Sequence, residues 1–85
     1  MAQWIVYSRP DCSLCDTMQI ELAAMLGARS AGVQVIDITG DAELERLYGK
    51  RVPALTIEGK LICYYYLNRE RVGRYLADSP DAAVS

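Results

Sequence analysis

The sequence predicts a single α/β domain whose elements follow the order β-α-β-α-β-β-α. Three observations lead to this prediction. An apolar run at residues 4–7 is followed by a stretch of helical periodicity and by a second apolar run at residues 33–38, which is the pattern of a strand–helix–strand unit. Two further apolar runs flank Glu58-Gly59, which is a hairpin turn signal. The length of 85 residues allows one small domain with a modest core.

The first strand–helix–strand unit extends from residue 4 to residue 38. Residues 4–7 are largely apolar, as in a strand that is buried on both faces of a sheet. Asp11 is the expected N-cap of a helix from Cys12 to about Gly27, and the glycine is its expected stop. Because a helix of this length joins the two strands, we expect them to be parallel, with a right-handed crossover. The apolar positions of the helix recur at helical spacing. They are Cys15, Met18, Leu22, Met25 and Leu26.

The second half of the chain predicts a short helix, a hairpin and a last helix. The hairpin strands are expected at residues 54–57 and from residue 60 to about residue 66. Asn68 is expected to cap the last helix, at residues 69–77. The short helix is expected at residues 42–48, after three candidate capping residues. The candidate caps are Thr39, Gly40 and Asp41; the apolar residues of the short helix are Leu44, Leu47 and Tyr48; those of the last helix are Val72, Tyr75 and Leu76.

Composition and charge exclude several classes of function. The chain has no histidine, which excludes histidine-based triads and metal sites, and its net charge of −2 argues against nucleic-acid binding. Neither a signal-peptide pattern nor an apolar run of membrane-spanning length is present. We therefore expect a soluble cytoplasmic monomer without a membrane partner. We expect residues 1–78 to form the domain and residues 79–85 to be a disordered tail.

Two cysteines lie where the first strand gives way to the helix. In an intracellular protein, Cys12-Ser13-Leu14-Cys15 after a strand reads as a thioredoxin-like redox motif. The N-terminal end of a helix carries unpaired N–H groups and partial positive charge, which stabilise a thiolate and lower its pKa. Cys12 is therefore the expected nucleophile and Cys15 the resolving thiol. Arg9 adds positive charge nearby and two aspartates oppose it, and the sequence leaves this balance open.

The cysteine pair has two alternative uses. A zinc site needs four nitrogen or sulfur ligands, and the only further cysteine is Cys63. We therefore predict no metal site. A structural disulfide is the other alternative, but nothing in the chain indicates an oxidising compartment. Cys63 itself is interpreted as a small buried strand residue.

The chain resembles the glutaredoxins of the thioredoxin superfamily over about residues 3–77. Three features carry the resemblance. The first feature is the segment Val6-Tyr7-Ser8-Arg9-Pro10-Asp11-Cys12-Ser13-Leu14-Cys15, which is similar to the glutaredoxin segment in which Tyr, Ser and a basic residue precede the active cysteines. Arg51-Val52-Pro53 is similar to the family's Val-Pro, and a hairpin and a helix follow in the family's order. Short bacterial glutaredoxin-like proteins with Cys-x-Leu-Cys are the most similar group.

The resemblance implies a thioredoxin-like fold with a four-stranded mixed sheet and helices on both faces. It implies a cis peptide bond before Pro53, with the Val52 backbone available to a substrate chain. It further implies a redox function on protein or small-molecule disulfides, with no required cofactor. The residues expected to contact the substrate are Arg9, Ser13, Leu14, Val52 and Pro53.

The sequence departs from ordinary glutaredoxins at two points. Ser13-Leu14 replaces Pro-Tyr between the cysteines. Glutaredoxins carry a Gly-Gly turn and an aspartate that hold glutathione, and this region is occupied here by Tyr65-Tyr66-Leu67-Asn68-Arg69-Glu70. Two bulky tyrosines replace the turn, so we expect weak glutathione binding. We interpret the run Tyr64-Tyr65-Tyr66 as sheet-covering residues with alternating faces; a partner-docking patch is the alternative.

Two functions of other classes compete with thiol–disulfide exchange. One is a non-enzymatic binding module that keeps the fold. The other is an iron–sulfur cluster carrier that uses Cys12, which some glutaredoxins with serine after the first cysteine resemble. The expected partner of the oxidoreductase is a disulfide-containing protein or a glutathione-type thiol.

Overall fold

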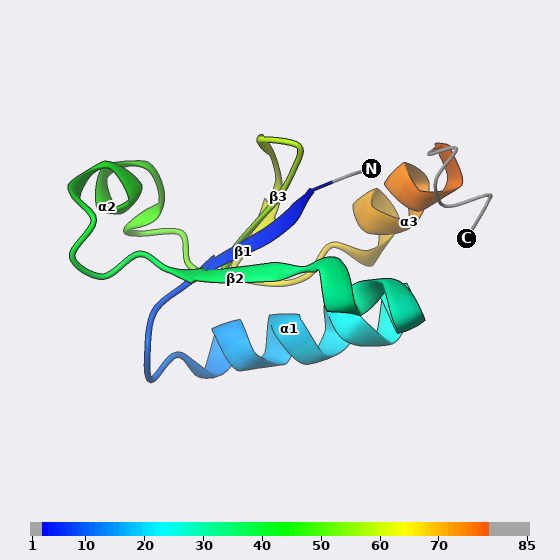
Figure 1. Ribbon diagram of the computed structural model, residues 1–85, viewed down its shortest axis with the longest axis horizontal. Helices are drawn as coiled ribbons and strands as arrows, with labels where there is room; N and C mark the ends of the chain where they lie inside the picture. Colours follow the sequence, from blue (N-terminus) through cyan, green and yellow to red (C-terminus); the bar gives the residue numbers. More distant parts are fainter. Residues whose placement is uncertain (1–2, 79–85) are drawn as a thin grey trace.

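A four-stranded mixed sheet forms the centre of the molecule (Figure 1). The computed structural model describes residues 3–78. The strand order is β2-β1-β3-β4, in which β1 and β2 are parallel and the other neighbouring pairs are antiparallel. The predicted parallel pair and the predicted hairpin are therefore confirmed. The strands are β1 (Trp4–Ser8), β2 (Gln34–Asp37), β3 (Ala54–Ile57) and β4 (Lys60–Tyr64).

Three α-helices flank the sheet, as the sequence predicts. In Figure 1, α1 runs below the sheet and α2 lies above one end of it. A short 3-10 helix, η1, connects α1 to β2. Gly27 has a φ of 59°, which few other residues tolerate, and α1 ends before it as expected. The helices are α1 (Ser13–Leu26), η1 (Gly27–Gly32), α2 (Ala42–Tyr48) and α3 (Arg69–Asp78).

The main core lies between α1, α3 and one face of the sheet. Successive residues of a strand point to opposite faces, so Trp4 and Val6 of β1 share the buried face. Val6 is paired with Leu55 of β3, and both side chains are fully buried. Each such side chain contributes about 1.5–3 kcal/mol relative to an exposed position. The helices add the buried residues Met18, Leu22, Leu26 and Val72.

Two predicted N-caps and the predicted hairpin turn agree with the structure, and one predicted N-cap does not. The carboxylate of Asp41 accepts the Leu44 N–H at 3.0 Å, and the Asn68 side chain accepts the Arg71 N–H at 2.9 Å. Glu58 and Gly59 have φ values of 52° and 82°, which is the type I′ geometry that fits the twist of a hairpin. The prediction that Asp11 caps α1 is wrong, because Cys12 is the N-cap.

Two predicted elements differ in extent or burial. We expected β4 to continue to about residue 66, but it ends at Tyr64 because Tyr65 takes a φ of 67°, outside the strand region. Leu47 is one of the predicted apolar residues of α2, but it is 42% exposed, and α2 contains no buried residue. The second helix is therefore attached to the sheet by few contacts.

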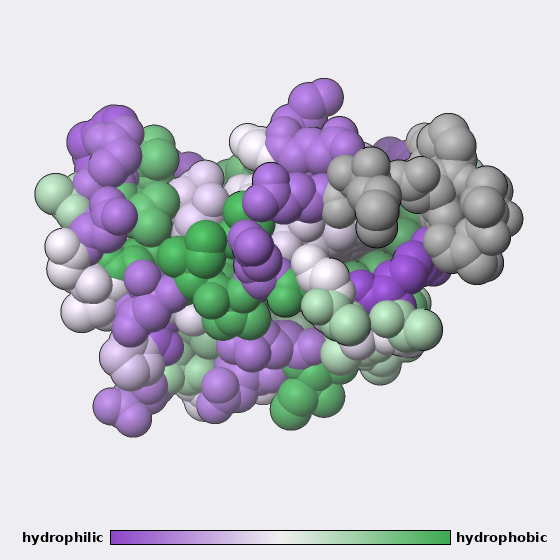
Figure 2. All heavy atoms as spheres, in the orientation of Figure 1, coloured by the Kyte–Doolittle hydropathy of each residue, from purple (hydrophilic) through white to green (hydrophobic). Residues whose placement is uncertain are grey.

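The face of the molecule that Figure 2 shows carries both apolar and hydrophilic side chains. Figure 2 shows apolar side chains gathered in the middle of this face, over β2, with hydrophilic side chains around them. No helix within residues 3–78 is long and apolar enough to cross a membrane. The predicted tail at residues 79–85 and the first two residues of the predicted domain lie outside the described residues.

Candidate functional site

The strand register brings four connecting segments to one end of the sheet. The last residue of β1, Ser8, is paired with Asp37, the last residue of β2. Ala54, the first residue of β3, is paired with both Tyr7 and Tyr64, the last residue of β4. The segments that leave or enter the sheet at this end therefore lie together. They are residues 9–12, 38–41, 49–53 and 65–68.

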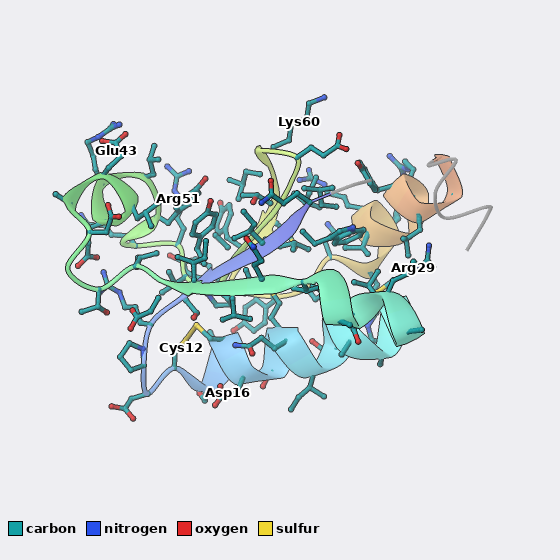
Figure 3. All side chains as sticks on the ribbon, viewed as in Figure 1. Cys12, Asp16, Arg29, Glu43, Arg51 and Lys60 are labelled. Atoms are coloured by element: carbon teal, nitrogen blue, oxygen red, sulfur yellow. A yellow bond between two sulfur atoms is a disulfide. The ribbon has the colours of Figure 1, made fainter. Side chains whose placement is uncertain are left out.

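The two cysteines of the predicted redox motif are joined by a disulfide at this end (Figure 3). Cys12 is partly exposed, whereas Cys15, in the first turn of α1, is 1% exposed. Their Cα atoms are 5.2 Å apart. One sulfur thus faces solvent and the other is covered by the core, which is the asymmetry expected of an attacking and a resolving thiol.

Cys12 begins the helix through its own sulfur atom. Its Sγ accepts the Cys15 backbone N–H at 3.1 Å, which satisfies one of the N–H groups that a helix start leaves unpaired. We expected Asp11 at the cap, but its φ of 58° turns the chain one residue before the helix begins. The same donor would stabilise a Cys12 thiolate in the reduced protein, because an N–H hydrogen bond favours the charged form.

Ser13 and Leu14 are the first two residues of α1. Ser13 is exposed and Leu14 is partly buried. Both lie in the turn where backbone N–H groups have no acceptor within the helix. The Ser13 carbonyl accepts the Thr17 hydroxyl at 3.0 Å. The two residues between the cysteines therefore lie beside the exposed sulfur, with Ser13 open to solvent.

Arg9 is paired within the chain. Its guanidinium donates to both carboxylate oxygens of Glu45 on α2 and to the Gly49 carbonyl at 3.3 Å. The Arg9 and Glu45 side chains are 34% and 36% exposed. The sequence predicts Arg9 as a positive charge for a substrate anion. The structure places it at the same end of the sheet as the cysteines, with its charge compensated by Glu45.

Glu45 is a site residue that sequence reasoning missed. It lies 36 positions after Arg9, and nothing in the local pattern of α2 distinguishes it from the neighbouring Glu43. A second contact holds the same helix: the rings of Tyr7 and Tyr48 stack with centroids 4.3 Å apart. Burial raises the pKa of Tyr48 above its ordinary value, and the adjacent Tyr7 raises it further. These two contacts fix α2 next to residues 9–12, the cysteine loop that leads from β1 to α1.

Val52 and Pro53 lie directly before β3, at the same end. The Val52–Pro53 peptide bond is cis, which is the isomer that the resemblance implies. Because Ala54 is paired with Tyr7, the register continues with Pro53 next to Ser8, at the start of the cysteine loop. Pro53 is buried and its carbonyl accepts the Tyr65 N–H at 2.8 Å. Within residues 3–78, no backbone hydrogen bond between segments uses Val52, which is partly exposed.

The third cysteine, Cys63, is a core residue. It is 8% exposed on β4, belongs to the main core cluster, and its sulfur accepts the Asn68 N–H at 3.5 Å. Burial raises the pKa of the Cys63 thiol, only partly offset by the Asn68 hydrogen bond and the charge of Arg71. The interpretation of Cys63 as a buried strand residue is confirmed. Within the described residues, no group of three metal-ligating side chains lies together.

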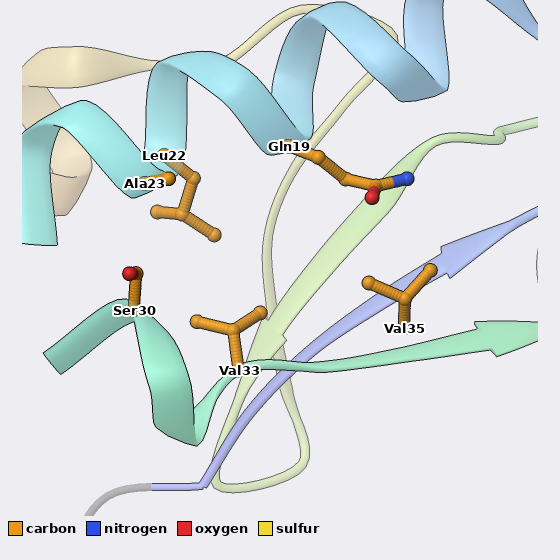
Figure 4. Close-up of a pocket in the computed structure, with 6 residues that line it drawn as sticks. All are labelled: Gln19, Leu22, Ala23, Ser30, Val33 and Val35. Atoms are coloured by element: carbon orange, nitrogen blue, oxygen red, sulfur yellow. The ribbon is translucent and has the colours of Figure 1, made fainter.

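A pocket of about 190 Å³ lies between α1, η1 and β2 (Figure 4). Figure 4 shows side chains from the helix and the strand facing each other across it. Its lining contains no residue that the sequence predicted for the site, and no part of the cysteine loop. It is lined by Gln19, Leu22, Ala23, Ser30, Val33 and Val35.

Comparisons with known proteins agree with this geometry. A family model described as Glutaredoxin-like domain (DUF836) matches residues 3–77. The solution NMR structure of protein Ne2328 from Nitrosomonas europaea is similar, with 36% identity and a TM-score of 0.78 over 87% of this chain and 89% of that chain. The X-ray structure of structural genomics target XcR50 from X. campestris has 33% identity and a TM-score of 0.67, over 91% of this chain and 99% of that one.

A more distant structure supports the fold alone. The crystal structure of SA0789 from Staphylococcus aureus, a protein of unknown function, has 16% identity and a TM-score of 0.63 over 99% of this chain and 93% of that chain. No curated protein matches the sequence. The thioredoxin-like fold and the resemblance to glutaredoxin-like proteins, which the sequence predicts, are confirmed by these matches together with the CxxC pair.

Proposed function

The chain belongs to the glutaredoxin-like domain (DUF836) family, and we propose that it is a thiol–disulfide oxidoreductase that acts through Cys12 and Cys15. One observation carries the proposal. The two sulfurs form a disulfide at the start of α1, with Cys12 partly exposed and Cys15 buried. This arrangement allows an external thiol or disulfide to reach the Cys12 sulfur, while the Cys15 sulfur stays covered by the protein and adjacent to it.

The proposed reaction begins with the reduced protein. The Cys12 thiolate attacks one sulfur of a substrate disulfide, which forms a mixed disulfide and releases the other substrate sulfur as a thiolate that takes a proton from water. The Cys15 thiolate then attacks the Cys12 sulfur and releases the second substrate thiol. Two electrons pass to the substrate, and the protein is left with the Cys12–Cys15 disulfide seen in the structure. A dithiol, or two small thiols, reduces it again.

The substrate chain is proposed to lie along Val52. Its backbone groups make no hydrogen bond to another segment within residues 3–78, so they can pair with an extended substrate as a strand edge does. Ser13 and Leu14 border the exposed sulfur on the helix side. Pro53 lies between Val52 and the first position of β3 and is buried.

Protein disulfides are the proposed substrates, in preference to glutathione. The Arg9 guanidinium already forms a salt bridge with Glu45. Arg9 therefore attracts a glutathione carboxylate less strongly than an unpaired arginine would. Tyr65 and Tyr66 replace the glycine turn of ordinary glutaredoxins. We propose that no cofactor is required. The monomeric state and the cytoplasmic location stay predictions from the sequence.

Redox titration tests the function. The reduced protein is equilibrated with buffers of reduced and oxidised dithiothreitol, and the Cys12–Cys15 pair is quantified by alkylation and mass measurement. We expect one reversible two-electron transition, which Cys12→Ser abolishes and Cys63→Ala leaves unchanged. The transition must be accompanied by turnover of a peptide disulfide. A reversible transition without turnover favours a binding module, and a brown protein with bound iron favours a cluster carrier.

A further inference from the structure

Tyr65 adopts a backbone conformation that is unusual for its size. Its φ is 67°, in the left-handed region that bulky residues rarely enter. The Tyr66 N–H donates to the Tyr64 carbonyl at 2.8 Å, a bond that spans two residues and makes Tyr65 the centre of a γ-turn. The γ-turn with a positive φ is the rare and strained type. Strain of this kind persists where the surrounding contacts determine it, and it concentrates at functional sites.

Two contacts connect Tyr65 to the segment that carries Val52. Its backbone N–H donates to the Pro53 carbonyl at 2.8 Å, and its hydroxyl donates to the Lys50 carbonyl. Tyr65 thus holds both ends of residues 50–53 at once. The ring also meets Tyr64 edge to face, with centroids 5.0 Å apart.

The hydroxyl contact explains why a tyrosine occupies this turn. Glycine or asparagine would take the same φ with less strain and would keep the N–H bond to Pro53. Neither has a side chain that ends in a hydroxyl at the distance of Lys50. What tyrosine adds is therefore the second bond, which fixes the start of the loop rather than the turn itself.

We propose that Tyr65 is a positioning residue for polypeptide substrates, an inference that rests on the proposed function. By holding Lys50 and Pro53, it fixes the Val52 backbone where an extended chain on either side of the target disulfide can pair with it. A small disulfide without a peptide backbone makes no use of Val52. Tyr65 therefore sets the preference for polypeptide disulfides and does not affect the exchange step at Cys12.

The test compares two substrates in one variant. Tyr65→Phe keeps the ring and removes only the hydroxyl bond to Lys50. For a disulfide between two short extended peptides, we expect KM to rise about threefold to tenfold with kcat unchanged, the effect of one neutral hydrogen bond. For bis(2-hydroxyethyl) disulfide we expect no change. Tyr66→Phe is the matched control, because the Tyr66 side chain is 71% exposed and makes no hydrogen bond to the described residues.

A second variant and a second measurement separate the outcomes. Tyr65→Asn removes the same hydroxyl but tolerates the positive φ, so it should reproduce the change in KM even if Tyr65→Phe folds poorly. In the oxidised protein, a peptide with serine in place of cysteine should shift the Val52 amide NMR resonance, and Tyr65→Phe should weaken that binding.

The two proposals fail in different ways. If the wild-type protein turns over neither disulfide, the proposed oxidoreductase function fails, while a Tyr65-dependent shift of the Val52 amide still supports the positioning role. Suppose that the wild-type protein turns over both disulfides. The positioning role is then overturned if Tyr65→Phe lowers kcat/KM by the same factor for both substrates, and also if it changes kcat/KM for neither. Absence of any peptide-induced shift at Val52 also overturns it.

Discussion

Replacement of Glu45 by glutamine should lower the free energy of unfolding and at the same time raise the activity of the protein with anionic disulfides. Arg9 and Glu45 are each about one-third exposed, at 34% and 36%. The pair therefore lies between exposed pairs, which contribute about 0.2–1 kcal/mol, and buried pairs, whose disruption costs about 3–5 kcal/mol. Solvent screening and the retained amide oxygen argue for the lower end, so we expect a loss of about 1 kcal/mol. For a domain of this size, that corresponds to a fall in Tm of about 4–8 °C.

The neighbouring Glu43 provides a matched control on the same helix. It pairs with Arg46 at 2.6 Å, but both side chains are about two-thirds exposed, at 65% and 67%. Glu43→Gln should therefore change the free energy of unfolding by about 0.5 kcal/mol or less. Thermal unfolding followed by circular dichroism, with and without added salt, compares the two variants under identical conditions.

The Glu45→Gln variant should lose stability but gain activity with an anionic substrate. Glu45→Gln leaves the Arg9 charge uncompensated at the end of the sheet that carries Cys12, so kcat/KM for glutathione disulfide should rise. Activity with an uncharged disulfide should not change. Equal Tm values for Glu45→Gln and Glu43→Gln would refute the view that the Arg9 pair attaches α2. An unchanged preference for glutathione disulfide would refute the view that Glu45 blocks anion binding.

Three further predictions concern the thiols and glutathione. In the reduced protein, Cys12 should be alkylated faster than Cys15 and Cys63 near neutral pH, which peptide mass mapping can measure. Equal alkylation rates would contradict the assignment of Cys12 as the nucleophile. The Cys15→Ser variant should accumulate mixed disulfides. Burial raises the pKa of the Cys63 thiol above its ordinary 9.0, so the folded state keeps a proton that the unfolded state loses. Stability should thus be steady below pH 9 and fall above it, and Cys63→Ala should reduce that slope in urea unfolding. Calorimetry of Cys15→Ser with oxidised glutathione should show at least tenfold weaker binding than an ordinary glutaredoxin; comparable affinity would show that the tyrosine segment does not obstruct the site.

The sequence predicts most of the fold because its local signals agree with one another. The residues that cap α2 and α3 form the expected hydrogen bonds, and the Glu58-Gly59 turn has the expected conformation. The apolar positions of α1 face the core at the predicted spacing. Each of these features depends on residues within four positions of one another, so the chain itself carries the information.

The features that the sequence does not predict depend on contacts between distant segments or on unusual backbone conformations. Arg9 and Glu45 are 36 residues apart, and charge alone does not identify the partner. Asp11 is a good capping residue by type, but its positive φ moves the cap to Cys12. Tyr65 reads as a strand residue because tyrosine favours strands, yet contacts with Lys50 and Pro53 hold it in a turn.

These exceptions all lie at the end of the sheet that carries the disulfide. The rigid part of the site is the start of α1, where Cys15 is packed in the core and Cys12 caps the helix with its own sulfur. The loop before β3, which is proposed to meet the substrate, is instead held through Tyr65. The helix α2, which pairs with Arg9, is held through Glu45 and the ring of Tyr48. The helix α2 contains no buried residue, and segments with little buried apolar surface open at low free-energy cost. Exchange chemistry therefore depends on the well-packed helix start, whereas the choice of substrate depends on two segments that single side chains hold in place. Substitutions of Glu45 or Tyr65 should change selectivity without changing the reactivity of the cysteine pair.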